Sequence, residues 1–474
     1  MIGGGSQAPA VRAAPAAAAA PAEADPSPSR VTAAPAEVRE RLPLPTPRAL
    51  QLLALGLAPA MLAGAMPWLL GWLLAFDLLV VVACGLDLVL ARRRRLPAVK
   101  REAPARLTVG TRESIQLVLH GEAPCKGTLR DAPDPRLESD GHLQHFEIPR
   151  GGTALSMRLL ATTRGRFRLG PLHLRVQGPL GLVQRRAEVA DTLELEAWPD
   201  LGALSRDALA LVHGSRGEAR RRALRPEDGR EFHGLRTYRP GEDARGIDWK
   251  ATARRDVPVV RVLRPEQHQP VLLLLDCGRH MSGLSGGRRR LDLAVEAALK
   301  LAAAGLAAGD RVGLLCYDDR IRVHLPPRGG REHLRSLAGA LLHLEAGYAE
   351  SDPGLALQTA LRDLQRRALV VVFTDLVDAE SARPILDHLA RLRPRHLPLL
   401  ATLEDVPLTR RASEVPRDVA GAYERHAAQR LDEGLRRALG QLRLQGARVV
   451  HEPPERFGPG SVNAYLELKA RGAI

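Results

Sequence analysis

The fold is decided by the stretch Val271-Leu-Leu-Leu-Leu-Asp276-Cys-Gly-Arg-His-Met281, in which five apolar residues run directly into a carboxylate. Further short apolar runs follow it, and they alternate with longer segments of helical periodicity. Near-continuous apolar strands between helices are typical of a parallel sheet covered on both faces. We therefore predict an α/β doubly wound domain over residues 268–474.

The elements predicted for this domain share strong apolar patterning. Strands are predicted at residues 271–275, 311–317, 321–325, 369–373, 397–402 and 447–451. Helices are predicted at residues 291–308, 331–344, 353–366, 381–391 and 419–444. Ligands of open sheets of this kind bind at the carboxyl ends of the strands, so residues that follow strands are the candidates for a site.

Upstream of this domain, the pattern changes to short segments in which apolar and polar residues alternate. Ser114-Ile-Gln-Leu-Val-Leu119 and Leu172-His-Leu-Arg-Val176 are examples, and Gly and Pro separate the segments. Alternation of period two with this spacing is typical of the strands of a small sandwich. We predict a β-sandwich over residues 97–200.

The N-terminal residues 1–48 are dominated by Ala, Pro and Gly, with almost no large apolar side chain before Leu42. A segment of this composition cannot bury enough surface to offset its chain entropy. It therefore predicts a disordered Ala/Pro-rich tail.

Residues 49–90 form a long apolar run whose strongly polar members are Gln51, Asp77 and Asp87. A helix needs about 20 apolar residues to cross a bilayer, so the run predicts two transmembrane helices joined by a tight turn near residues 64–71. Arginines stand at both ends, which places both ends in the cytoplasm by the positive-inside rule. The sequence predicts a multi-pass transmembrane helical hairpin in the bacterial inner (cytoplasmic) membrane, with the soluble domains in the cytoplasm.

Two details of this region bear on that interpretation. A signal peptide cleaved at Ala63-Gly64-Ala65 is the alternative, and the long leader and the second apolar segment disfavour it.

Asp77 lies near the middle of the second predicted helix, where a charged carboxylate is costly. We expect it to be protonated or to face a partner helix.

Missing motifs and the spacing of the cysteines argue against several classes of function. The chain has no Gly-x-x-x-x-Gly-Lys-Ser/Thr loop and no His-Glu-x-x-His motif, so we predict that it is not an enzyme and needs no cofactor. The cysteines show neither close pairing nor metal-ligand spacing, which indicates free thiols in a reducing compartment. They are Cys84, Cys125, Cys277 and Cys316.

A second informative stretch lies in a basic segment over residues 201–267 and reads Pro240-Gly-Glu-Asp-Ala-Arg-Gly-Ile-Asp-Trp-Lys250. It resembles the motif Pro-Gly-Asp-Asp-x-Arg-x-Ile-Asp-Trp-Lys of the bacterial membrane-protein family known as domain of unknown function fifty-eight. That family has no agreed activity. The residues that carry the resemblance are Gly241, Asp243, Arg245, Asp248, Trp249 and Lys250.

The charge of this segment allows two interpretations. Residues 216–264 hold 14 Lys or Arg and 8 Asp or Glu, with aromatic residues between them. Cationic surfaces with aromatics can bind nucleic acid, but the mixed signs lead us to predict no nucleic acid. We favour a structural role, in which Arg245 and Asp248 form a salt bridge, Trp249 packs under the sheet and Lys250 caps the start of a helix.

The α/β domain resembles a von Willebrand factor A domain. That family holds a divalent cation with Asp-x-Ser-x-Ser after the first strand, a hydroxyl from a later loop, and an Asp after the fourth strand. The resemblance implies Asp276, Ser351 and Asp375 as metal ligands. Gly278 and His280 stand where the two serines would be. Mg²⁺ keeps part of its hydration shell and can be held by few ligands, but the set is degenerate.

The resemblance implies a membrane-anchored cytoplasmic protein-interaction scaffold. Its implied partner is an ATPase of the MoxR type in the AAA superfamily, and the pair would aid assembly or activation of other proteins. Membrane lipid is the other expected partner. The partner-binding candidates are Arg279, His280, Ser351 and Asp352.

Two alternatives of other classes remain open. One is a metal-dependent adhesion module that binds an acidic ligand through Mg²⁺, against which the missing serines argue. The other is a hydrolase that uses Asp276 and Asp375, for which the sequence offers no evident general base.

Overall fold

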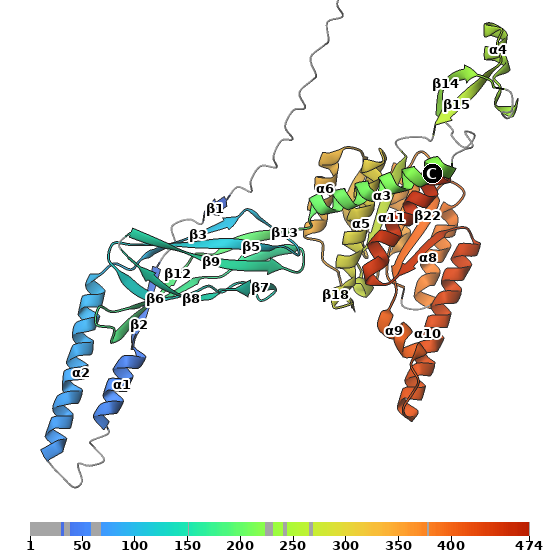
Figure 1. The fold of residues 1–474 in the computed structure, drawn as a ribbon. Coiled ribbons are helices and arrows are strands. Elements are labelled where there is room, and N and C mark those ends of the chain that lie inside the picture. The colour runs from blue at the N-terminus through green and yellow to red at the C-terminus, as the bar shows by residue number, and fades with distance from the viewer. Residues whose placement is uncertain are drawn as a thin grey trace, which may run out of the picture.

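The computed structural model shows a mixed α/β chain with several sheets (Figure 1). A β-sandwich lies between two N-terminal helices and an α/β domain, a name used here for residues 269–473. A small unit of a hairpin and a helix stands apart from both. The structure describes residues 30–32, 38–57, 68–149, 151–222, 231–239, 244–264, 269–376 and 379–473.

Six strands form the main sheet of the α/β domain, in the order β20-β19-β16-β21-β22-β23. Neighbours are parallel except β19 and β20, because residues 318–320 are too short a link for the crossover that a parallel pair needs. All predicted strands are present. The sheet differs from the predicted parallel sheet in that its edge strand β20 runs antiparallel to β19. The strands are β16 (Pro270–Asp276), β19 (Arg311–Tyr317), β20 (Ile321–Arg328), β21 (Leu369–Phe373), β22 (Leu397–Leu403) and β23 (Arg448–Glu452).

Helices cover both faces of this sheet. Along β16, Leu273 and Leu275 enter one core and Leu272 and Leu274 enter the other, as the alternation of a strand requires. The first core is closed by α3 (Leu201–Arg222), α5 (Arg290–Ala307), α6 (Arg331–Leu342) and α11 (Pro454–Ala470). The second is closed by α7 (Pro353–Asp363), α8 (Ala379–Leu392) and α10 (Val419–Leu444).

Three helices were not predicted, namely α3, α11 and α9 (Val406–Ser413). The first of them falls in the segment predicted as a basic linker over residues 201–267. Its Leu204, Ala208 and Val212 are nevertheless buried in the first core. The α/β core therefore takes part of its packing from chain upstream of residue 268.

The sandwich is built from three sheets, in the orders β1-β3-β5-β9-β7, β2-β12-β11-β6-β8 and β10-β13-β4. Alternate residues of its strands form two buried apolar clusters. The first sheet contains β1 (Arg30–Thr32), β3 (Ala98–Pro104), β5 (Arg112–Gly121), β7 (Leu137–Asp140) and β9 (Gly151–Ala161). The others contain β2 (Val38–Pro45), β4 (Arg106–Thr108), β6 (Cys125–Arg130), β8 (Leu143–Ile148), β10 (Gly165–Leu169), β11 (Leu172–Gln177), β12 (Val183–Val189) and β13 (Leu193–Trp198).

The strand β2 corrects the prediction of a disordered tail over residues 1–48. It pairs antiparallel with β12, and Arg185 on β12 donates to Glu40 on β2 at 2.5 Å. A strand added to the edge of a sheet gains backbone hydrogen bonds without needing a core of its own, which composition alone does not reveal. Residues 1–29 and 33–37 lie outside the described residues.

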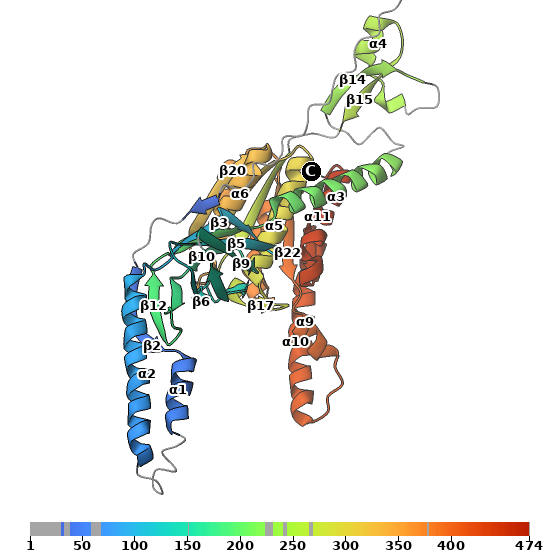
Figure 2. The ribbon, with the colours of Figure 1, turned by 60° about the vertical axis from the view of Figure 1, so that its left-hand side comes forward.

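The N-terminal helices are α1 (Pro47–Leu57) and α2 (Trp68–Arg93). They lie side by side in both views (Figures 1 and 2), and Asp77 on α2 packs against Gly56 on α1. Among the described residues one helix, over Leu74–Arg93, is long and apolar enough to cross a membrane. Residues 64–67 of the predicted turn lie outside the described residues and residues 68–71 belong to α2, so two crossings stay a prediction.

The helix α2 is joined to the sandwich through Asp87, which is fully buried. Its carboxylate accepts hydrogen bonds from the backbone N–H groups of Leu180, Leu182 and Val183 at 2.8, 2.8 and 2.9 Å. Arg185 donates to two carbonyls at the end of the same helix, at 2.8 and 2.7 Å. The apolar helix and the sandwich therefore share a polar junction in which these helix-end groups are paired.

Candidate functional site

Three carboxylates meet at the carboxyl edge of the α/β sheet. Asp276 ends β16, Asp375 follows β21 and Asp405 follows β22. These strands are consecutive neighbours in the sheet, so their ends lie together at the position where open sheets bind ligands.

Asp276 is held by the loops around it and is almost fully buried. Ser351 and Thr374 donate their hydroxyl groups to its two oxygens, Thr374 at 2.6 Å, and the N–H of Gly278 donates at 2.8 Å. A side chain at position 278 would overlap the Ser351 hydroxyl. The serine that the family pattern has at this position therefore does not fit here.

Asp375 faces a protein cation. Arg290, the first residue of α5, forms an ion pair with Asp375 through one guanidinium nitrogen and with Asp405 at 2.9 Å through the other. The side chains of Arg290 and Asp375 are largely buried. An arginine thus already supplies positive charge to two of the three carboxylates.

The predicted ligands Asp276, Ser351 and Asp375 do lie together, but their oxygens are used by hydrogen-bond and ion-pair partners. Within the described ranges, no group of three or more His, Cys, Asp and Glu side chains is arranged to hold a metal ion. The donors present fit Mg²⁺ poorly, because an arginine occupies one side of the site. The sequence analysis did not identify three residues of this site, Thr374, Arg290 and Asp405. Only Thr374 could have been suspected, because it is the neighbour in sequence of the predicted ligand Asp375.

The rim above these carboxylates carries the predicted partner-binding residues. Arg279 is exposed and lies 3.5 Å from the carboxylate of Glu350, and it also contacts His280. Ser351 and Asp352 have internal roles, since Ser351 donates to Asp276 and Asp352 caps α7 by accepting from the N–H of Leu355.

Tyr348 is the residue of this rim that the sequence did not single out. It is 95% exposed, and it belongs to the loop that meets Arg279, whose N–H donates to the carbonyl of Ala349 at 2.9 Å. A tyrosine offers a large rigid contact area with a polar tip. The rim therefore presents an exposed tyrosine on a loop that is hydrogen-bonded to the backbone of Arg279.

The described part of the motif, residues 244–250, lies in the separate unit of β14 (Glu231–Thr237), β15 (Val259–Arg264) and α4 (Trp249–Arg255) (Figures 1 and 2). Asp248 is the N-cap of α4 and accepts from the N–H of Ala251 at 3.0 Å. It also forms a salt bridge with Arg261 at 2.8 Å, and this hydrogen bond lowers the pKa of the Asp248 carboxyl.

These contacts correct two details of the predicted structural role, the cap and the packing of Trp249, and leave the predicted salt bridge of Arg245 with Asp248 a prediction. The partner of Asp248 found in the structure is Arg261, while the side chain of Arg245 and residues 241–243, with Gly241 and Asp243, lie outside the described residues. The helix cap is Asp248 and not Lys250. Trp249 is 69% exposed and does not pack under the sheet, because two strands and a helix of seven residues are too small to bury an indole.

A literal Gly-x-Ser-x-Gly spacing occurs at Gly283-Leu-Ser-Gly-Gly287. A nucleophile elbow places its serine on a sharp turn between a strand and a helix. Ser285 instead ends β17 (Leu284–Ser285), which forms a hairpin with β18 (Arg288–Arg289), and its side chain is buried. The spacing therefore lacks the structural context of a hydrolase nucleophile.

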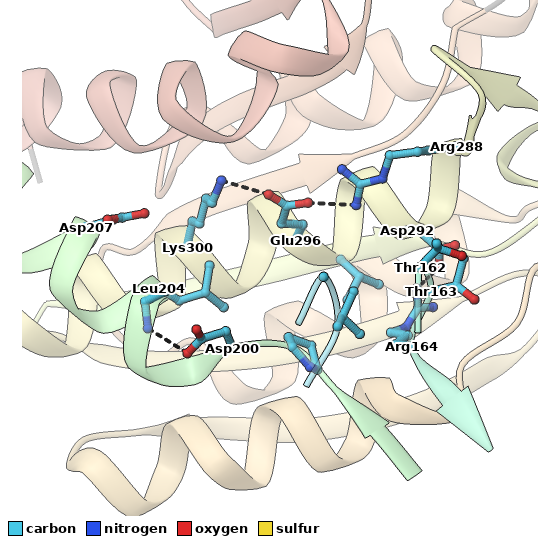
Figure 3. Close-up of a pocket in the computed structure, with 15 residues that line it drawn as sticks. Thr162, Thr163, Arg164, Asp200, Leu204, Asp207, Arg288, Asp292, Glu296 and Lys300 are labelled. Atoms are coloured by element: carbon cyan, nitrogen blue, oxygen red, sulfur yellow. Dashed lines mark hydrogen bonds and ion pairs between the residues drawn. The ribbon is translucent and has the colours of Figure 1, made fainter. Parts of the chain in front are cut away.

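A cavity of about 390 Å³ lies between the sandwich and the α/β domain (Figure 3). Glu296 on α5 accepts from Lys300 and Arg288, both at 2.8 Å. Burial acts to raise the pKa of Glu296, and the two hydrogen bonds outweigh it, so the pKa lies below its ordinary value. The other lining residues include Thr162, Thr163, Arg164, Asp200, Leu204, Asp207 and Asp292. Glu296 is thus ionised and already paired with its two basic neighbours.

Comparison with known proteins gives matches over part of the chain. Uncharacterized protein Rv1480 of Mycobacterium tuberculosis and Uncharacterized protein Mb1516 of Mycobacterium bovis are each 28% identical to it over 189 residues. The match covers 39% of this chain, which spans 56% of the length of these relatives.

Among solved structures, the conserved hypothetical protein BatB from Bacteroides thetaiotaomicron matches 43% of this chain and 98% of its own, with 14% identity and a TM-score of 0.30. An aerotolerance-related membrane protein from Bacteroides fragilis matches 42% of this chain and 98% of its own, with 15% identity and a TM-score of 0.27.

The family match covers the motif unit and much of the α/β domain. It begins inside β14 and ends inside α9, so it includes the loops that carry Asp276, Ser351 and Asp375. The resemblance drawn from the motif is thereby confirmed. Residues 234–409 match the model of the family described as Protein of unknown function DUF58.

Proposed function

We propose that this protein is a membrane-anchored scaffold of the bacterial inner membrane whose α/β domain, of the von Willebrand factor A type, binds a protein partner in the cytoplasm. The apolar helix α2 supports the anchor. Arg92, Arg93, Arg94 and Arg95 follow its apolar part, and the positive-inside rule puts such a cluster on the cytoplasmic side. The α/β domain and all strands of the sandwich except β1 and β2, which precede α1, follow this cluster in the chain.

The proposed partner is an ATPase of the MoxR type, as the family resemblance implies. The observation that carries a protein-binding role is Tyr348, which is 95% exposed on the loop that is hydrogen-bonded to the backbone of Arg279. Tyr and Arg are enriched among the residues that dominate binding energy at protein interfaces. The arginine-filled site beneath them supports recognition of a protein surface over capture of a metal-bound ligand.

The test measures the affinity of the full chain in nanodiscs for the purified MoxR-type ATPase of the same bacterium. We expect Tyr348→Ala to weaken binding about 30-fold, the effect of a hot spot of about 2 kcal/mol. Arg279→Glu should slow association most strongly at low salt, because rim charges act on the association rate. Leu143→Ala and Arg112→Glu change exposed residues of the sandwich and serve as matched controls.

Equal binding by all four variants would remove the docking site from this rim. Loss of binding only in Trp249→Ala, on the separate motif unit, would move the site to α4. No binding by the wild type would refute the ATPase partner itself.

A further inference from the structure

The helices α9 and α10 form an arm that projects from the α/β domain. In α10 the buried residues Leu435, Ala438, Leu439 and Leu442 lie in the C-terminal half, where the helix packs on the sheet. The N-terminal half extends away from the sheet together with α9 (Figure 1). The tip of the arm is thus the stretch from the end of α9 to the first turns of α10.

The tip is apolar although it is exposed. Val415, Val419 and Tyr423 are 81%, 73% and 75% exposed. Val419 and Tyr423 are four residues apart on one helix and therefore lie on the same face, and Val415 precedes them in the connecting loop. An exposed apolar group of this kind marks an interaction site more often than isolated surface residues do.

The geometry of the tip is well defined. Asp418 caps α10 by accepting from the N–H of Gly421 at 2.7 Å. Gln429 on α10 donates to the carbonyl of Ala412 on α9 at 3.1 Å, and Arg411 pairs with Glu424 at 3.3 Å. The apolar residues are therefore presented by a braced helical hairpin.

The charge around the tip is positive. Between Arg410 and Arg430 the chain has five arginines against three acidic residues, and Arg417 lies exposed between the two valines. Apolar residues beside arginines are the pattern of elements that rest in the interface of anionic bilayers.

The direction of the arm points to the same surface. In both views the arm and α2 leave the body of the molecule on the same side, and the tip of α10 lies at the level of α2, beyond the sandwich (Figures 1 and 2). Asp87 and Arg185 hold α2 to the sandwich, and Arg164 holds the sandwich to the α/β domain. The bilayer crossed by α2 would therefore meet the tip.

We propose that the tip of the α9–α10 arm inserts Val415, Val419 and Tyr423 into the surface of the bilayer that α2 crosses, with the neighbouring arginines on anionic headgroups. The inference rests on the proposed membrane anchor and adds a second attachment point. Two attachments would fix the orientation of the α/β domain, and hence of its rim, relative to the membrane.

The test uses the full chain in liposomes that contain phosphatidylglycerol. Cys84→Ala and Cys125→Ala remove the accessible thiols, since Cys277 and Cys316 are buried. An NBD fluorophore is then attached to a single new cysteine, Val419→Cys at the tip or Leu444→Cys at the other end of α10, where Leu444 is 88% exposed. Val82→Cys on α2 reports on the anchor.

We expect doxyl-labelled lipids to quench the fluorophore at positions 82 and 419 and not at 444. Adding Arg417→Glu, or replacing the anionic lipid by phosphatidylcholine, should reduce quenching at 419 severalfold and leave position 82 unchanged. Quenching at 82 with none at 419 would overturn the arm proposal and keep the anchor. No quenching at 82 would overturn the anchor. A blue-shifted but unquenched fluorophore at 419 would mean that protein covers the tip, which also overturns the proposal.

Discussion

Arg290 places a positive charge between two carboxylates at the carboxyl edge of the sheet. Its guanidinium therefore competes with a divalent cation for Asp375 and Asp405. The identity of this one side chain therefore decides whether the edge favours a metal ion or an internal ion pair.

We predict that Mg²⁺ does not stabilise the wild type but does stabilise Arg290→Met. Removing one partner of a largely buried pair costs about 3 to 5 kcal/mol, and a cation bound to the freed carboxylates would restore part of it by mass action. Thermal unfolding with and without millimolar Mg²⁺ measures both effects. Arg288→Met, which removes a neighbouring arginine paired with Glu296, is the control. Tight Mg²⁺ binding by the wild type that Asp276→Ala abolishes would contradict this account.

At the scale of elements, the junction of α2 with the loop after β11 depends on one carboxylate. The two oxygens of Asp87 accept from the N–H groups of Leu180, Leu182 and Val183. Gly178 lies so close to this carboxylate that an added Cβ would contact it at 2.5 Å. The Asp87 carboxylate therefore packs closely against the loop that begins at Gly178.

We predict that Asp87→Ala detaches this loop from α2. Each buried donor left without an acceptor costs about 1 to 3 kcal/mol, so hydrogen exchange at residues 180–183 should rise more than tenfold. Asp77→Ala on the same helix is the matched control, since no hydrogen-bond partner of the buried Asp77 Oδ1 is found among the described residues. Equal exchange in both variants would mean that the junction is held by other contacts.

At the scale of the whole molecule, Arg164 connects the sandwich to the α/β domain. It lies between β9 and β10 and donates to the carbonyls of Leu341 and Leu344, at 3.0 and 2.6 Å, and it forms an ion pair with Asp292. Burial lowers the pKa of Arg164 to about 10, so the guanidinium is still charged at neutral pH. The carbonyls belong to the end of α6, where positive charge is favourable.

We predict that Arg164→Met loosens the two domains. Hydrogen bonds from a charged group are worth about 1.5 to 3 kcal/mol, which corresponds to faster exchange at the end of α6 by about one to two orders of magnitude. Limited proteolysis between residues 199 and 230 should also become faster. Arg166→Met changes an exposed arginine of the adjacent strand and should do neither. A variant Arg164→Met as protected as the wild type would contradict the role of this contact.

Local pattern predicted much of the fold because each signal is contained in a few adjacent residues. The strand ending at Asp276 is one apolar run, and the predicted helix at residues 419–444 has the bounds of α10. Composition gave a wrong prediction where strand pairing decides the structure of a segment. It assigned residues 38–45 to a tail, whereas β12 provides an edge to which they add as a strand. It also predicted a buried Trp249, which is 69% exposed in the structure.

The sequence by itself determined the strands of the α/β sheet, five of the helices that pack around it, the apolar helix and the resemblance to the family, since these depend on periodicity and on one short motif. Only the tertiary structure decided what the site contains. Arg290 and Asp375 are 85 residues apart, and Leu180 and Asp87 are 93 apart. Contacts over such separations depend on sheet order and loop closure, and nothing in the local pattern of either residue specifies them. The same holds for the arm, whose apolar tip acquires a direction only from the packing of α10 on the sheet.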